Sequence, residues 1–210
     1  MQNVIFATDK TIKEIVRTEI ERLGIKADLN HVDVSGVFSM RELFHKSEFI
    51  GDISAWDTSN VVDMSFMFSQ SKFDGDISQW VVSSVQDMNG MFACSEFNGD
   101  LSDWDVSSVE NMCEMFYQSK FDGDIRHWDT SRVTNMAGMF SQANFDGDVS
   151  NWDVSKVDEM DGIFRRSAFG GDLSKWSIRA DCIVDSALFD CPAQENPLPM
   201  ALTVPEATEG

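Results

Sequence analysis

Phe73-Asp74-Gly75-Asp76-Ile77-Ser78-Gln79-Trp80 is the stretch that decides the fold of this 210-residue chain. Its phenylalanine, its Gly-Asp pair and its tryptophan occur six times in all, at a constant step of 24 residues. The phenylalanines are Phe49, Phe73, Phe97, Phe121, Phe145 and Phe169, and the tryptophans are Trp56, Trp80, Trp104, Trp128, Trp152 and Trp176. A repeat of fixed period indicates supersecondary units that bury their apolar side chains by stacking on one another.

Each repeat contains two kinds of apolar spacing. In Asp76–Trp80 the apolar Ile77 and Trp80 stand among polar residues, and the stretch is interpreted as a short half-buried strand. In Val61–Phe68 the apolar residues follow the spacing of a helix of about two turns, with Ser59 placed to cap it. The sequence therefore predicts an α/β repeat solenoid of about six 24-residue coils, right-handed like other strand–crossover–strand units. A helical outer segment would make the stack curve, whereas a tighter 3₁₀ turn would keep it straighter.

The ends of the array depart from the repeat. Residues 1–30 are expected to form an N-terminal cap, with a helix over 8–23 that ends at Gly24. Residues 31–178 are assigned to the coils. Residues 179–191 lose the double methionine, and their apolar side chains are expected to close the core. Residues 192–210 contain all four prolines and no basic residue, so a disordered acidic tail is expected there.

The charge balance narrows the classes of partner. The net charge of −20 disfavours nucleic acid, whose phosphates need lysine and arginine for neutralisation. It favours a protein partner with a basic surface, or cations. No apolar run reaches the length of a membrane span. No signal peptide is recognised at the N-terminus, so the chain as given is expected to be cytoplasmic.

The cysteines carry no metal-site or disulfide-framework spacing. Cys94, Cys113, Cys182 and Cys191 contain no Cys-x-x-Cys pair, and free thiols are the expected state. A Cys182–Cys191 bridge is the main alternative. The three histidines, His31, His45 and His127, occupy different positions of the repeat, and none has the spacing of a metal or catalytic site.

The repeat motif resembles a known bacterial family. Phe73–Trp80 and Trp128–Phe140 are similar to the BspA-type leucine-rich-repeat surface proteins, a group also described by a 25- or 26-residue surface-protein repeat and by a lipoprotein-associated domain of unknown function. The resemblance covers residues 29–178. It implies a leucine-rich-repeat-like solenoid, a cell-surface location and roles in attachment and protein binding. It implies no catalytic residues.

Stacked aspartates are the sharpest candidates for chemistry. Asp-Gly-Asp spacing offers oxygen ligands that Ca²⁺ accepts, and the candidate metal ligands are Asp74, Asp76, Asp122, Asp124, Asp146 and Asp148. The competing interpretation is that each carboxylate binds backbone N–H groups of its own turn. Stacked carboxylates repel one another unless they are hydrogen-bonded or bridged by an ion. A second series, Asp57, Asp105, Asp129 and Asp153, is expected to cap the N-terminus of the helix predicted after each of them, together with the serine that follows.

The remaining rows of the repeat are assigned to the core or to recognition. The methionine–phenylalanine and tryptophan rows are interpreted as core, the latter in preference to a stacking platform for sugars or bases. Recognition is expected where the copies differ. The candidate partner-binding residues are Gln79, Asp103, Arg126, His127, Asn151 and Lys175. A second variable row reads Lys46, Gln70, Ala93-Cys94, Gln118, Gln142 and Arg165-Arg166.

These observations favour a binding module over an enzyme, since no nucleophile–base constellation or phosphate-binding loop is present. A non-enzymatic protein-binding module of the bacterial surface or adhesion type is the leading hypothesis. An intracellular inhibitor or immunity-type protein that blocks a basic partner is the second. A calcium-dependent structural array is the third. No cofactor other than Ca²⁺ is expected.

Overall fold

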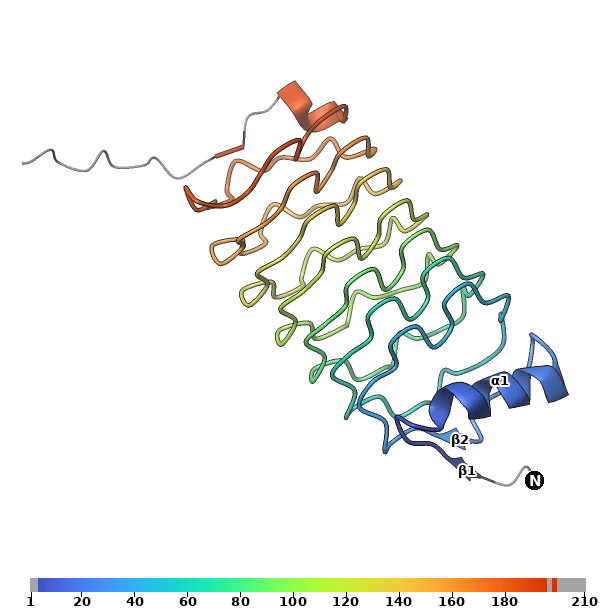
Figure 1. Ribbon diagram of the computed structural model, residues 1–210. Helices are drawn as coiled ribbons and strands as arrows, with labels where there is room; N and C mark the ends of the chain where they lie inside the picture. Colours follow the sequence, from blue (N-terminus) through green and yellow to red (C-terminus); the bar gives the residue numbers. More distant parts are fainter. Residues whose placement is uncertain (1–3, 196–197, 200–210) are drawn as a thin grey trace, which may run out of the picture.

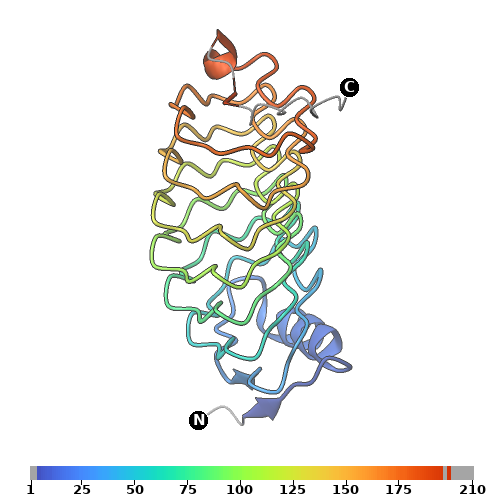
Figure 2. The same ribbon diagram turned by 90° about the vertical axis from the view of Figure 1, so that its left-hand side faces the viewer.

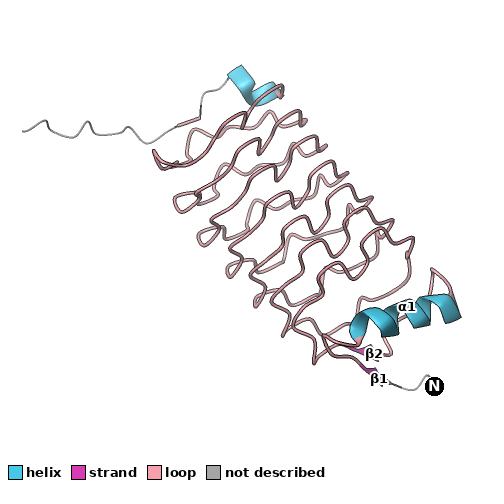
Figure 3. Ribbon diagram, in the orientation of Figure 1, coloured by secondary structure: helices cyan, strands magenta, loops and turns pink. Residues whose placement is uncertain are grey.

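The computed structural model describes residues 4–195 and 198–199. Figure 1 shows coil stacked upon coil between a helical N-terminal end and a short 3₁₀ helix at the other end. The elements are β1 (Ile5–Phe6), α1 (Ile12–Leu23), β2 (Val32–Asp33) and η1 (Pro192–Glu195). Between β2 and η1 the described chain forms no further helix or strand, as Figure 3 shows.

The N-terminal end is closed by α1 and a two-stranded parallel sheet. β1 and β2 pair at the outer end of the stack (Figure 2). α1 buries Ile12 and its apolar face against the core and ends at Gly24, where φ is 92°. The helix begins later than predicted, because Asp9 has another role. Its carboxylate accepts the N–H groups of Phe38 and Ser39, at 2.7 and 3.0 Å, and so caps the first coil.

The helix predicted over Val61–Phe68 does not form. Alternate residues instead donate their N–H groups to carbonyls of the next coil, such as Met64 N–H to Asp87 O at 2.9 Å. The residues between them close tight turns, such as Met67 N–H to Met64 O at 3.1 Å. Parallel bridges between residues 24 apart run through this segment from Ser39 to Ile183. The pairing therefore lies in the segment whose apolar spacing predicted a helix.

Coil spacing explains why turns replace the helix. Packed helices need roughly 8–10 Å between axes, whereas hydrogen-bonded neighbours sit roughly 4.8 Å apart. A succession of turns satisfies the backbone at the shorter distance and still directs the same apolar side chains inward. The turns require a positive φ at two residues per coil, as at Phe66 (56°) and Gln70 (57°), which a helix does not allow.

The strand predicted at Asp76–Trp80 is a turn. Trp80 N–H donates to Ile77 O at 3.1 Å, and the side chains of Ile77 and Trp80, at the two ends of this turn, are both buried. Each tryptophan also donates its indole Nε1–H to a main-chain carbonyl of the preceding coil, as Trp104 does to Ile77 O at 3.1 Å. All six tryptophans are buried, which confirms their interpretation as core.

Aromatic stacking continues from coil to coil along the core. Phe92 and Phe116 lie 5.7 Å apart between ring centroids, and Phe116 and Phe140 lie 5.6 Å apart. The buried methionines fill the space beside them, a use to which their flexible side chains are suited. The core is therefore a series of columns of like residues, each continued by the next coil.

The C-terminal end differs from its prediction in detail. Of the residues expected to close the core, Ile183 and Phe189 are about half exposed, at 51% and 47%. The buried side chains there include Cys182, Cys191 and Ala193. The predicted disordered tail begins instead with η1, and residues 196–197 and 200–210 lie outside the described part of the chain. All four cysteines are free thiols.

The repeat glycines are required by the phenylalanine two residues before each of them. A Cβ added to Gly75 would lie 2.8 Å from the Phe73 ring, and one added to Gly51 would lie 2.0 Å from the Ala27 carbonyl oxygen. Gly51→Ala should therefore lower the free energy of unfolding by about 1–3 kcal/mol. Urea unfolding measures this, with Gly36→Ala as the control because its nearest atom would be 3.4 Å away. Equal stability of the two variants would contradict the steric explanation.

Candidate functional site

The candidate metal ligands are engaged by the backbone. Asp76, Asp124 and Asp148 each accept the N–H group two residues later, at 2.9 to 3.1 Å. These hydrogen bonds resolve the repulsion expected between stacked carboxylates. The bond from Ser78 N–H is the main cause that lowers the pKa of Asp76, and it outweighs the opposing effect of the Asp52 and Asp100 charges.

The other three candidates form a ladder between coils. The Asp74 carboxylate accepts the N–H of Asn98 at 2.8 Å, the Asn98 side chain accepts the N–H of Asp122 at 2.9 Å, and the Asp122 carboxylate accepts the N–H of Asp146 at 3.0 Å. Asp146 continues the series to Gly170 N–H at 2.8 Å. At this position, side-chain oxygens accept the hydrogen bonds that join one coil to the next. Elsewhere in the stack, main-chain carbonyl oxygens accept them.

Calcium is expected not to bind to these aspartates. No group of three His, Cys, Asp or Glu side chains in the described ranges is arranged to hold a metal ion, and the carboxylates already accept N–H groups. Calorimetric titration with Ca²⁺ should show no saturable heat, and the melting temperature should be the same in chelator. A saturable heat that disappears in the Asp74→Ala, Asp122→Ala variant would reverse this expectation and support the calcium-dependent array.

The second aspartate series was expected to cap helices but caps turns instead, because no helix forms in these coils. Asp57, Asp105, Asp129 and Asp153 each accept the N–H group of the serine two residues later, at 2.9 to 3.1 Å. The histidines described differ in their surroundings. His31 Nε2 contacts Glu19 beneath α1 at 2.9 Å, whereas His127 is exposed on a turn.

The predicted partner-binding residues are all exposed on turns before or beside the tryptophans. We call this set the turn row: Gln79, Asp103, Arg126, His127, Asn151 and Lys175. Three of its members make side-chain contacts, since Lys175 Nζ lies 3.2 Å from Asn151 Oδ1 and Arg126 pairs with Asp124 at 2.9 Å. The structure thus brings these residues into one line at the coil spacing, and the line carries both signs of charge.

A second variable surface lies on the hydrogen-bonded turns, and most of it was not assigned a role from the sequence. We call it the ladder face, the outward side chains of residues 41–46, 65–70, 89–94, 113–118, 137–142, 161–166 and 185–190. One position alone reads Glu42, Phe66, Gly90, Glu114, Gly138, Gly162 and Ser186. The second variable row of the sequence (Gln70 and its equivalents) lies here. The remaining positions were missed because they were placed on a helix.

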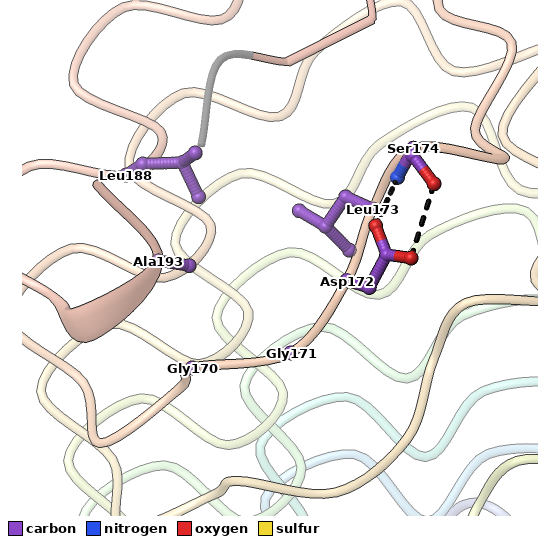
Figure 4. A pocket seen from close by; sticks show the side chains of 7 residues that line it. All are labelled: Gly170, Gly171, Asp172, Leu173, Ser174, Leu188 and Ala193. Atoms are coloured by element: carbon purple, nitrogen blue, oxygen red, sulfur yellow. Dashed lines mark hydrogen bonds between the residues drawn. The ribbon is translucent and has the colours of Figure 1, made fainter. Parts of the chain in front are cut away.

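A cavity lies at the C-terminal end of the stack. It has a volume of about 430 Å³ and is lined by Gly170–Ser174, Leu188 and Ala193, as Figure 4 shows. The Asp172 carboxylate turns to Ser174, accepting its N–H at 2.8 Å, and does not form a reactive pair with another group. The cavity occupies the level at which a further coil would stack, because the chain leaves the repeat at η1. It is therefore explained by the end of the array.

Comparison with known proteins gives a family. No curated protein and no solved structure matches the chain. None of the helices described is both long and apolar enough to cross a membrane. The model of one repeat family, however, matches twice, over residues 12–120 and 93–198, which together cover most of the sequence. The chain therefore belongs to the family described as Mycoplasma protein of unknown function, DUF285.

Proposed function

We propose that this protein is a non-enzymatic protein-binding module of the bacterial surface or adhesion type, built on a right-handed, leucine-rich-repeat-like solenoid. The observation that carries the proposal is the contrast between the rows of the repeat. The buried rows and the turn aspartates hardly change from coil to coil, whereas the ladder face and the turn row change at almost every step. The turn row is exposed, and most ladder-face positions are exposed or half-buried. A regular scaffold with a varied surface is how repeat proteins recognise partners.

The charge supports a partner with a basic surface. The chain has 36 acidic and 16 basic residues, and complementary charge steers association and selects among partners. Binding of such a partner is expected to weaken as salt rises, because exposed charges are screened. The same chemistry would serve an intracellular inhibitor of a basic protein, and the identity of the partner decides between the two roles.

Affinity capture from an extract of the source cells tests the proposal. The wild-type protein is compared with a ladder-face variant (Gln70→Ala, Gln118→Ala, Gln142→Ala) and a turn-row variant (Gln79→Ala, Asp103→Ala, Asn151→Ala). One specific protein should bind the wild type and bind one of the variants at least about tenfold more weakly. Recovery of no specific protein, or of the same proteins on all three, would overturn the proposal.

A further inference from the structure

A notch lies in the ladder face near the middle of the stack. A cavity of about 190 Å³ lies there between three successive coils, and its lining includes Glu114, Tyr117, Ala137, Gly138, Ser141 and Asp161. The middle coil contributes only short side chains. At the equivalents of Ser141 the flanking coils carry Tyr117 and Arg165. The middle coil is therefore recessed, and its neighbours form the two walls.

Carboxylates stand on both walls of this notch. Glu114 is exposed and forms no ion pair among the described residues. Asp161 presents an Oδ1 atom that is buried and has no hydrogen-bond partner. A buried carboxylate oxygen without a donor is costly. No group of the described chain donates to this oxygen, so the notch has an unused acceptor on the wall formed by Asp161.

The cation available nearby within the chain is directed elsewhere. Arg165 also lines the notch, but its guanidinium carbon lies 5.5 Å from the centroid of the Phe189 ring in the next coil. The opposite wall is held in place. The Tyr117 hydroxyl accepts hydrogen bonds from the side-chain amides of Gln118 and Gln142, at 2.9 and 3.2 Å. Tyr117 is the only tyrosine in the sequence.

The local potential is negative. Cys113, at the rim of the notch, has its pKa raised to about 11, first by burial and then by the charges of Glu114 and Glu159. The same charges that disfavour a thiolate favour a bound cation.

We propose that the notch receives an arginine side chain of the protein partner, an inference that rests on the proposed function. Coils repeat at roughly 4.8 Å, so the coils of Glu114 and Asp161 stand about 10 Å apart with the recessed coil between them. A planar guanidinium placed there donates to the carboxylate on each wall and lies against the tyrosine ring. Gly138 is essential to the notch because any side chain at that position fills it.

Two variants separate the charge of the notch from its shape. Asp161→Asn keeps the shape and removes one charge. Gly138→Asn keeps every charge and fills the space. Gly138 has a φ of 60°, which asparagine adopts more readily than most residues, and an added Cβ meets only Glu114 Cγ at 3.5 Å. Asp153→Asn is the control, since Asp153 is an exposed carboxylate outside the notch. Melting temperatures establish that all variants are folded.

A phage-displayed library of random linear peptides is the probe. Peptides selected on the wild type should carry arginine at one shared position, and their binding should fall about tenfold on Asp161→Asn and on Gly138→Asn but not on Asp153→Asn. Peptides without arginine, selection of lysine instead, undiminished binding to Gly138→Asn, or no selected peptide would each overturn the assignment. If capture from the source cells succeeds while this test fails, the proposed function stands and the notch assignment falls. If peptide selection succeeds while capture from the source cells fails, the notch binds arginine but the proposed function falls.

Discussion

Phe116→Ala should lower the free energy of unfolding by about 3–5 kcal/mol, the usual cost of emptying a buried aromatic site. Phe116 is fully buried in a middle coil. Its ring centroid lies 4.3 Å from that of Phe121 and within 6 Å of those of Phe92 and Phe140. A cavity there breaks the column that couples the two halves of the stack, and repeat proteins depend on such contacts between neighbours.

Urea unfolding followed by tryptophan fluorescence measures this effect. The matched control is Phe6→Ala, because Phe6 is 75% exposed and its truncation should change stability by less than about 0.5 kcal/mol. The Phe116 variant is also expected to broaden the transition, since halves that are less tightly coupled unfold separately. A loss below about 1 kcal/mol with an unchanged slope would show that neighbouring coils collapse into the space.

The repeat identifies the buried residues but not the conformation that buries them. Val61, Met64, Met67 and Phe68 are all buried, and their spacing suits a helix as well as it suits successive turns. A signal against the helix was present in the sequence. Gly90, Gly138 and Gly162 stand in the middle of the supposed helices of other coils, where glycine costs about 1 kcal/mol relative to alanine. Positive φ at these residues explains their presence.

The sequence also contained evidence about the role of Asp74, Asp122 and Asp146, which contact the next coil through their side chains. Asn98 stands in the series of Asp74, Asp122 and Asp146 and makes the same side-chain contact with the next coil. An amide in that place means that the position needs an oxygen acceptor rather than a charge. A metal site would have been the weaker interpretation on that ground alone.

The notch could not be predicted from one repeat at a time. It exists because Ala137, Gly138 and Ser141 are short while Tyr117 and Asp161 in adjacent coils are not. Which residues face one another across coils follows from the pairing of the turns, such as Gly138 N–H with Asp161 O at 2.8 Å. The sequence placed these residues on a helix, whose outward side chains would have had other neighbours.

Acid should destabilise the protein despite its net charge of −20. The turn aspartates Asp52, Asp76, Asp100, Asp148 and Asp172 have lowered pKa values in the folded state, mainly because backbone N–H groups bind their carboxylates. A carboxylate with a lowered folded pKa contributes stability above its unfolded pKa of about 4 and loses it as the pH falls through the folded value. The urea midpoint should therefore fall steeply below about pH 4.

The relief of charge repulsion on acidification has the opposite effect on stability. Its size relative to the lost hydrogen bonds decides whether acid destabilises the protein. Protonation of an acidic surface reduces self-repulsion, which would stabilise the fold as the pH falls. At physiological salt the screening length is about 8 Å, so only adjacent carboxylates repel strongly. For Asp76 that repulsion, from Asp52 and Asp100, is smaller than the effect of the hydrogen bonds, since its pKa is lowered on balance. The loss of these hydrogen bonds is therefore expected to outweigh the relief of repulsion, so stability should fall in acid.

The variant Asp76→Asn, Asp100→Asn, Asp148→Asn tests which effect controls the acid limb. An asparagine side-chain oxygen accepts the same N–H group, so the turns keep their caps, but it does not titrate. The variant should be close to the wild type in urea midpoint at neutral pH and should lose less stability below about pH 4. If the urea midpoint of the variant fell as steeply below about pH 4 as that of the wild type, groups other than these three aspartates would be responsible for the acid sensitivity. A midpoint that rises in acid for both proteins would mean that repulsion, and not hydrogen bonding, dominates the surface.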